Sequence, residues 1–103
     1  MVEYIETNNK RFPVRFGFNA LREFSRVTGM PLAMLSSLQN DITLDQAITL
    51  VWCGFKDGAR KDKMPFKMAV DDVADLLDDD ATILEKAFDI FGRQFNTEEE
   101  KKQ

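Results

Sequence analysis

Histidine is absent from this 103-residue sequence, and cysteine occurs once, at position 53. A lone cysteine cannot form an intrachain disulfide, and without histidine the usual zinc ligand sets and the histidine-dependent catalytic triads are excluded. No apolar run approaches the ~20 residues that span a bilayer, and the first residues lack the basic stretch and apolar run of a signal peptide. These absences favour a cytoplasmic protein that is not an enzyme, holds no metal or cofactor, and binds neither a membrane nor a small-molecule substrate.

The composition is otherwise that of an ordinary globular domain, with 44% hydrophobic and 31% charged residues. At this length we expect one core, and therefore a single globular domain over residues 1–95. Residues 96–103 contain nothing apolar to bury, which predicts a disordered charged tail.

The first sixteen residues have the pattern of two strands around a tight turn. Asparagine-rich residues 7–10 separate residues 2–6 from residues 11–16, and asparagine tolerates the left-handed backbone that such turns need. In the second strand apolar side chains alternate with others, which predicts one buried and one exposed face. The first face holds Phe12, Val14 and Phe16, and the second holds Arg11, Pro13 and Arg15.

Helical periodicity follows the strands. We expect Asn19 to cap a helix that Gly29 ends, and Pro31 to precede a short helix over residues 32–38. Thr43 and Gln46 have the spacing of a capping box, and the helix that they start should reach about Arg60. That helix is apolar over more than half of its circumference, so we expect it to be central.

Two further helices are predicted over residues 70–77 and 81–95. The inward face of the last helix should hold Leu84, Ala87, Phe88, Phe91 and Phe95. The sequence thus predicts a mainly α (α+β) fold, in which a short N-terminal β-hairpin packs on a bundle of about five helices.

Charge is unevenly distributed along the chain, whose net charge is −4. Residues 1–70 hold 10 basic and 7 acidic side chains, whereas residues 71–103 hold 4 basic and 11 acidic ones. Opposite patches on one small protein favour either intramolecular closure or head-to-tail self-association, but solvated faces without a partner explain the pattern equally well.

Residues 56–67 carry five basic side chains and are interrupted by Gly58 and Pro65, which predicts a basic, mobile loop that overlaps the end of the central helix. Clustered lysine and arginine suit phosphate, but an isoelectric point near 4.8 argues against nucleic acid. The aspartates of residues 71–80 lack the glycine and the closing glutamate of an EF-hand loop, so helix capping accounts for them better than a metal. Cys53 is expected to be a packing residue within the apolar helix.

Large apolar side chains are the remaining candidates for function, because adaptable methionine and aromatic surfaces bind varied apolar partners. We expect Trp52 and Phe55 on the central helix, together with Met34 and the segment Met64-Pro65-Phe66, to form a partner-binding groove. Burial of Trp52 and Phe55 as plain core is the alternative.

The stretch from Phe12 to Phe24, followed by Thr28-Gly29, resembles the tail assembly chaperones of long-tailed bacteriophages and prophages. The segments over residues 51–60 and 70–77 look like the same family in the same order, so the resemblance spans most of residues 2–95. Its motifs are structural patterns and carry no catalytic residues.

The resemblance implies a small, mainly helical cytoplasmic protein that binds the tape-measure protein. Such a chaperone keeps the tape measure soluble, helps to recruit tail-tube subunits, and is absent from the mature virion. An apolar groove with a polar rim is the expected way to hold an amphipathic helix. Two alternatives stay open, a virion joining or tail-completion protein that forms a ring, and a regulator that binds DNA through residues 56–67.

Overall fold

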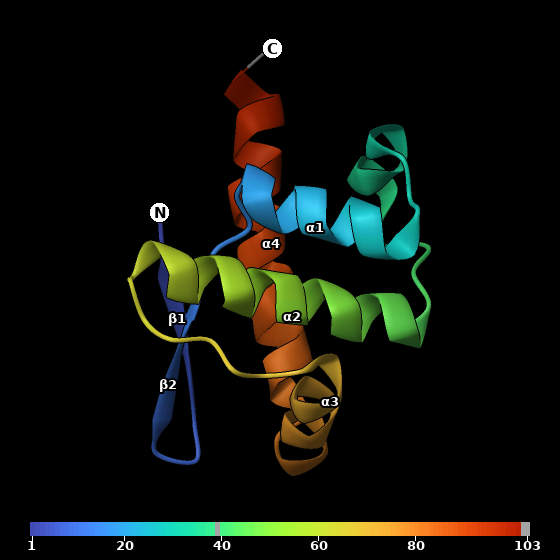
Figure 1. The fold of residues 1–103 in the computed structure, drawn as a ribbon. Coiled ribbons are helices and arrows are strands. Elements are labelled where there is room, and N and C mark those ends of the chain that lie inside the picture. The colour runs from blue at the N-terminus through green and yellow to red at the C-terminus, as the bar shows by residue number, and fades with distance from the viewer. Residues whose placement is uncertain (39, 102–103) are drawn as a thin grey trace.

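The computed structural model describes residues 1–38 and 40–101, and within α4 it describes side chains up to residue 95. The predicted mainly α (α+β) fold is confirmed: an N-terminal hairpin lies on four α-helices and one 3-10 helix in this part of the chain (Figure 1). The elements are β1 (Glu3–Thr7), β2 (Lys10–Val14), α1 (Phe18–Thr28), the 3-10 helix η1 (Leu32–Ser37), α2 (Leu44–Lys61), α3 (Val70–Asp79) and α4 (Thr82–Lys101).

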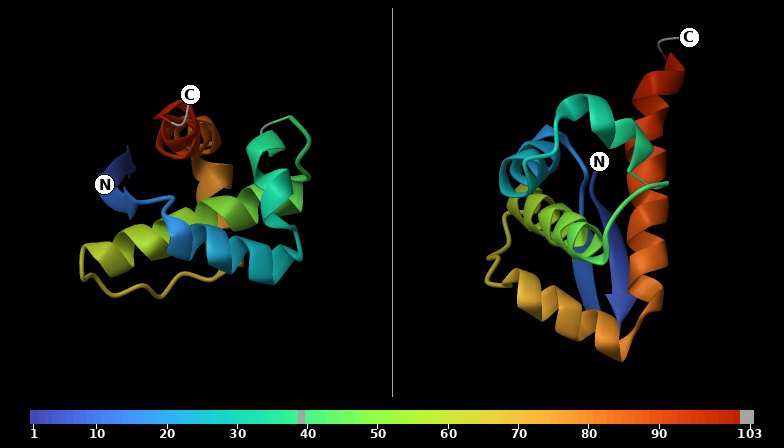
Figure 2. Two further views of the ribbon diagram at one scale, coloured as in Figure 1. Left: turned by 90° about the horizontal axis from the view of Figure 1, so that it is seen from above. Right: turned by 90° about the vertical axis from the view of Figure 1, so that its right-hand side faces the viewer.

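Helix α2 is the centre of the fold, as its apolar circumference predicts. It packs against α1, α3, α4 and β2, while β1 packs against α4. The right-hand view of Figure 2 shows the hairpin between α2 and α4, with α3 below them. Side chains that are almost completely buried come from every one of these elements, including Ile5 of β1, Leu35 of η1 and Val73 of α3.

The hairpin forms around Asn8 and Asn9, whose φ angles are 50° and 62°. Positive φ at both central residues is the type I′ geometry that matches the twist of a two-residue hairpin, and asparagine accepts it at low cost. Antiparallel pairing then places Thr7 opposite Lys10 and Tyr4 opposite Pro13. Hydrogen-bonded and non-hydrogen-bonded pairs alternate from the turn, so Pro13 takes a position where its missing N–H removes no ladder bond.

The predicted exposure of Pro13 is wrong, since Pro13 is buried against α2. The reason is Gly58 of α2, where a Cβ atom would lie 2.5 Å from the backbone of Pro13 and Val14. Gly58 therefore does not interrupt the helix but lets β2 approach it. Residues 56–61, expected in the basic loop, belong to α2, and the loop begins after them.

Helix starts agree with the sequence in one case and differ in another. Thr43 and Gln46 form the predicted capping box, with each side chain accepting a hydrogen bond from the other residue's backbone N–H. Asn19 does not cap α1, because the helix already begins at Phe18 and Gly17 is the residue before it. Gly29, with φ of 75°, ends α1 as predicted.

Asp80 joins the start of α4 to the hairpin. Its carboxylate accepts hydrogen bonds from the hydroxyl and backbone N–H of Thr82 and from the hydroxyl of Thr7 in β1. These bonds, that from the Thr82 hydroxyl foremost, lower the pKa of Asp80 below its ordinary value of 3.8. When folding lowers the pKa of a carboxyl, the ionised carboxylate stabilises the folded protein. This stabilisation is complete at pH values above the pKa of the unfolded state and is lost as the pH falls through the pKa of the folded state.

We therefore predict that Asp80→Asn destabilises the protein at neutral pH and that the difference from wild type shrinks below about pH 4. Urea denaturation of both proteins from pH 7 to pH 2.5 measures this difference. A difference that stays constant over the whole range would contradict the role of the carboxylate.

The buried face of α4 is rotated slightly from the expected one. Ala87 and Phe91 are buried as predicted, but Ile83 and Ile90 are also almost completely buried, whereas Leu84 and Phe88 are only half-buried. The helix is therefore seated with residues 83, 87 and 90 toward α2 and the hairpin. Helix α4 continues to Lys101, past the predicted helix end at residue 95. The side chains of residues 96–103, the predicted charged tail, lie outside those that the structure describes.

Candidate functional site

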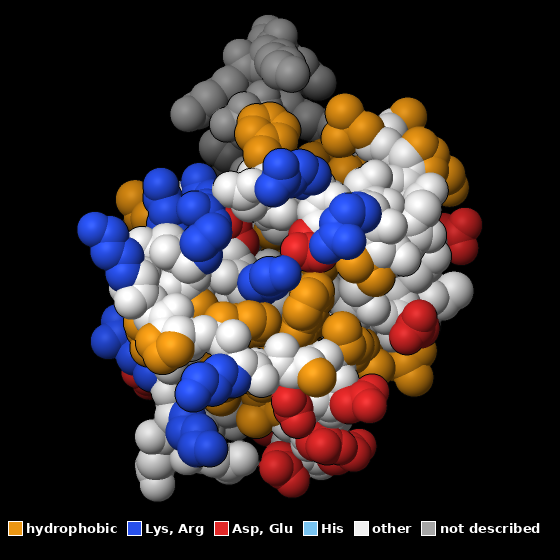
Figure 3. Space-filling view, viewed as in Figure 1, with side chains coloured by type: hydrophobic (Ala, Val, Ile, Leu, Met, Phe, Trp, Pro, Cys, Tyr) orange, Lys and Arg blue, Asp and Glu red, His pale blue; other side chains and the backbone are white. Residues whose placement is uncertain are grey.

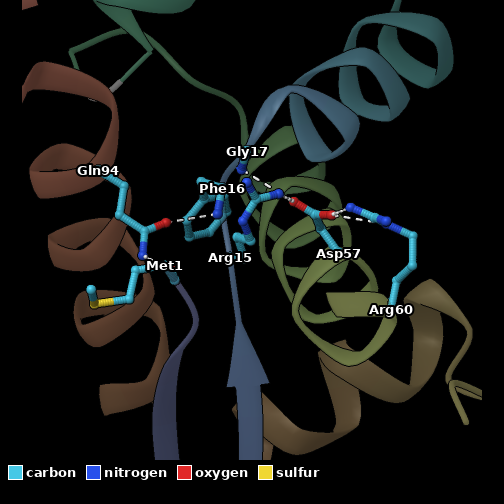
Figure 4. Close-up of polar contacts among 7 residues, drawn as sticks. All are labelled: Met1, Arg15, Phe16, Gly17, Asp57, Arg60 and Gln94. Carbon is cyan, nitrogen blue, oxygen red and sulfur yellow. Dashed lines mark hydrogen bonds and ion pairs between the residues drawn. The ribbon is translucent and has the colours of Figure 1, made fainter. Parts of the chain in front are cut away.

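The segment between β2 and α1 is hydrogen-bonded to α2 on one side and to α4 on the other (Figure 4). On one side Asp57 of α2, whose side chain is 1% exposed, accepts hydrogen bonds from Arg15 Nη1, the Gly17 N–H and the guanidinium of Arg60. On the other side Gln94 of α4 accepts a 2.8 Å hydrogen bond from the backbone N–H of Phe16. These groups are hydrogen-bonded to one another, except for the Nε atom of Arg15, which is buried without a hydrogen-bond partner. We interpret the cluster as the set of contacts that holds β2 against α2.

A pocket opens beside this fastened strand. We call it the β2–loop pocket, and its volume is about 360 Å³. Phe12 and Phe55 stack in it with ring centroids 5.3 Å apart. Its walls come from three parts of the chain, β2, the second half of α2 and the loop that follows: Lys10, Arg11, Phe12, Pro13, Phe55, Ala59, Met64, Pro65, Phe66, Lys67 and Met68.

The loop wall of the β2–loop pocket is tied to α2 at both ends. The backbone N–H of Met64 donates to the Ala59 carbonyl at 2.9 Å, and the indole N–H of Trp52 donates to the Met68 carbonyl at 2.8 Å. Between these bonds the ring of Phe66 packs against Trp52, with centroids 6.0 Å apart. These contacts therefore fix the position of the loop against α2.

The structure brings four of the five predicted partner-binding residues to this region. Phe55, Met64 and Phe66 line the pocket, and Trp52 lies behind its loop wall. Phe55 is 2% exposed, so it is at once core and pocket floor, while Met64 is 47% exposed at the mouth. Met34 is not among the lining residues, because it lies in η1, which Figures 1 and 2 place away from the loop.

No family model, curated protein or solved structure matches the chain. The β2–loop pocket and the charges around it are therefore the basis for a functional proposal.

Charge around the pocket is of one sign. Lys10, Arg11 and Lys67 are exposed members of its lining, and no acidic residue belongs to that lining. Arg11 also lies over the ring of Tyr4, 3.8 Å from its centroid. The Tyr4 hydroxyl donates to Asp62 at 2.7 Å, and this hydrogen bond raises the pKa of Tyr4.

The acidic side chains gather on the neighbouring helix. The space-filling view shows basic groups at the left, over the end of α2 and the hairpin, acidic groups at the lower right over α3, and hydrophobic side chains between them (Figure 3). The exposed carboxylates of α3 are Asp71, Asp72, Asp75, Asp78 and Asp79. The charge asymmetry of the sequence is thus also an asymmetry of the surface.

Two other groups considered for function, Cys53 and Asp72, have structural roles. Cys53 is 1% exposed, and burial raises the pKa of its thiol to about 12, so it is a packing residue with little thiolate at neutral pH. Asp72 accepts from the backbone N–H of Ala69 at the start of α3. Among the described residues no group of three acidic or cysteine side chains is placed to hold a metal ion, and no helix there has the length and hydropathy to cross a bilayer.

The sequence interpretation missed the β2 half of the pocket. Lys10, Arg11, Phe12 and Pro13 are adjacent in sequence but meet Met64–Met68 only through the packing of β2 on Gly58. The local pattern presents Gly58 as an interruption of the helix, whereas in the structure it is the residue that permits this packing. Met68, which follows the predicted loop segment, completes the lining.

Proposed function

We propose that this protein is a non-enzymatic tail assembly chaperone of a long-tailed phage or prophage. In this proposal it binds the tape-measure protein in the host cytoplasm, keeps it soluble, helps to recruit tail-tube subunits, and is absent from the mature virion. The sequence resemblance over residues 2–95 suggests the family, and the β2–loop pocket is the observation that carries the proposal.

The pocket supports binding of an apolar partner by its lining. Eight of its eleven residues are apolar, and they include three phenylalanines and two methionines. Apolar side chains that converge on an open hollow with charges at the edge are the usual arrangement for holding an amphipathic segment. Methionines adapt their shape, which suits a chaperone whose client offers many similar apolar turns.

A virion joining or tail-completion protein is the second candidate. Its support is the surface polarity, with basic groups near the pocket and carboxylates on α3, because opposite patches on one chain suit a head-to-tail ring. Such a protein would remain in the particle, and self-association would be its principal interaction.

Co-expression tests the proposal. The protein is produced with and without a tag together with the tape-measure candidate, the longest open reading frame just downstream. A soluble long protein that co-purifies at a defined ratio supports the chaperone. An insoluble, uncaptured long protein contradicts it, and recovery of this chain among the proteins of purified particles would favour the virion component.

A further inference from the structure

The β2–loop pocket has a size that limits what enters it. Its volume of about 360 Å³ lies at the lower end of the range for ligand sites, which is ~300–1,000 Å³. A pocket of this size accepts one or two side chains of a partner and not the whole face of a helix. Its occupant is therefore a short segment with a single apolar anchor.

The cations at its mouth are available for that segment. Elsewhere on the described surface Arg15, Arg60, Arg26, Lys56 and Arg93 form ion pairs with carboxylates. Within the same described part of the chain, seven cations form no ion pair: Lys10, Arg11, Arg22, Lys61, Lys63, Lys67 and Lys86. Of these, Lys10, Arg11 and Lys67 line the pocket. Arg11 stacks on Tyr4 and lies across the hairpin from Glu6. Three basic side chains with no ion-pair partner around an apolar hollow favour carboxylates.

From these observations we propose that the β2–loop pocket recognises an acidic segment of the partner, in which one large apolar side chain enters the pocket and flanking Asp or Glu carboxylates meet Lys10, Arg11 and Lys67. The inference rests on the proposed function, because it identifies the part of the tape-measure protein that docks here. It adds a sequence criterion, an apolar residue between acidic ones, by which the docking segment is found.

A second copy of this chain fits the pocket less well. Its acidic helix α3 has the right charge, but none of the exposed large hydrophobic side chains of the described residues belongs to α3. Helix α3 of a second copy would neutralise Lys10, Arg11 and Lys67 but would leave the apolar floor of the pocket empty. A partner that carries both the carboxylates and the anchor satisfies both parts of the site.

An extended polyanion also fits less well. The carboxylates of α3 lie on the same face as the pocket (Figure 3), where they would repel a nucleic acid backbone or an anionic bilayer that spreads over the surface. A short acidic segment held by one anchor avoids α3. The charge layout therefore favours a protein partner.

Trp52 supplies the readout for a direct test. It is the only tryptophan of the chain, and it contacts Phe66 and Met68 of the pocket lining. Two tryptophan-free synthetic peptides serve as probes, each with one central phenylalanine, flanked by glutamates in one and by lysines in the other. We expect a saturable change in Trp52 fluorescence with the glutamate peptide, weaker at high salt, and none with the lysine peptide.

The double substitution Lys10→Glu with Lys67→Glu should weaken binding of the glutamate peptide about tenfold, because each exposed attraction becomes a repulsion. Arg22→Glu with Lys86→Glu is the matched control: it changes the net charge equally at two exposed residues outside the pocket lining and should leave binding unchanged. Circular dichroism of both double variants verifies folding.

Equal binding of the two peptides, or equal weakening by both double variants, would overturn the inference. Duplex DNA or phosphatidylglycerol vesicles would overturn the inference in favour of a polyanion if they bind more tightly than the glutamate peptide and if the Lys10/Lys67 variant weakens that binding. Capture of the tape-measure protein equally by wild type and the Lys10/Lys67 variant would refute this docking mode and leave the chaperone function intact. If the Lys10/Lys67 variant weakens binding of the glutamate peptide but the wild type does not capture the tape-measure protein, the pocket chemistry is supported and the tape-measure partner is refuted.

Discussion

Replacement of Asp57 by alanine is expected to lower the free energy of unfolding by about 3 kcal/mol. The carboxylate is 1% exposed and accepts hydrogen bonds from Arg15, the Gly17 N–H and Arg60. Its loss leaves the half-buried N–H of Gly17 and two guanidinium groups without their acceptor. The estimate lies at the low end of the range for broken buried pairs, because Arg15 and Arg60 keep access to water, with side chains 24% and 51% exposed.

Urea denaturation followed by far-UV circular dichroism measures the change. Asp89→Ala is the matched control, since Asp89 also pairs with an arginine on its own helix but is 70% exposed, and its loss should cost less than about 1 kcal/mol. Similar losses for the two variants would show that Asp57 does not fasten β2 to α2.

Gly58→Ala should destabilise the protein by about 2 kcal/mol, although alanine favours a helix over glycine by about 1 kcal/mol. The new methyl group would lie 2.5 Å from the backbone of Pro13 and Val14. Backbone atoms cannot turn aside as the end of a flexible side chain can, so β2 must move away from α2. The same movement displaces Phe12 from Phe55 and opens the pocket floor.

Thermal and urea unfolding of Gly58→Ala measure the loss, and the peptide assay with Trp52 measures the damage to the pocket. Lys61→Ala, an exposed change at the end of the same helix, should stay within about 0.5 kcal/mol of wild type. An unchanged or raised stability of Gly58→Ala would mean that the close contact between α2 and β2 does not constrain the fold.

The fold was largely predictable because its elements have strong local signals. Positive-φ turn residues Asn8 and Asn9, the capping box at Thr43 and the helix stop at Gly29 act within a few residues, and each is visible in the sequence. The misassigned positions depend on distant contacts. The local pattern predicts a helix break at Gly58 and exposure of Pro13, because only the contact between these two residues shows what either one does.

The candidate site was predictable in part for the same reason. Trp52, Phe55, Met64 and Phe66 stood out by size and by their place around one helix and the following loop, and the structure brings them together. Met34 stood out by the same criterion, but η1 carries it to another part of the molecule. Lys10, Arg11 and Lys67 come together only because the hairpin lies against the loop, and no local sequence pattern encodes that contact.

One comparison tests the central claim that the β2–loop pocket holds the tape-measure protein. Met64 and Met34 are exposed to similar extents, 47% and 51%, so aspartate in place of either should leave the fold intact. Each variant is co-expressed with the tape-measure candidate, and the amount captured per molecule of this protein is quantified. The pocket account predicts a loss of about tenfold for Met64→Asp and wild-type capture for Met34→Asp. Wild-type capture by Met64→Asp, or equal losses for both variants, would contradict it.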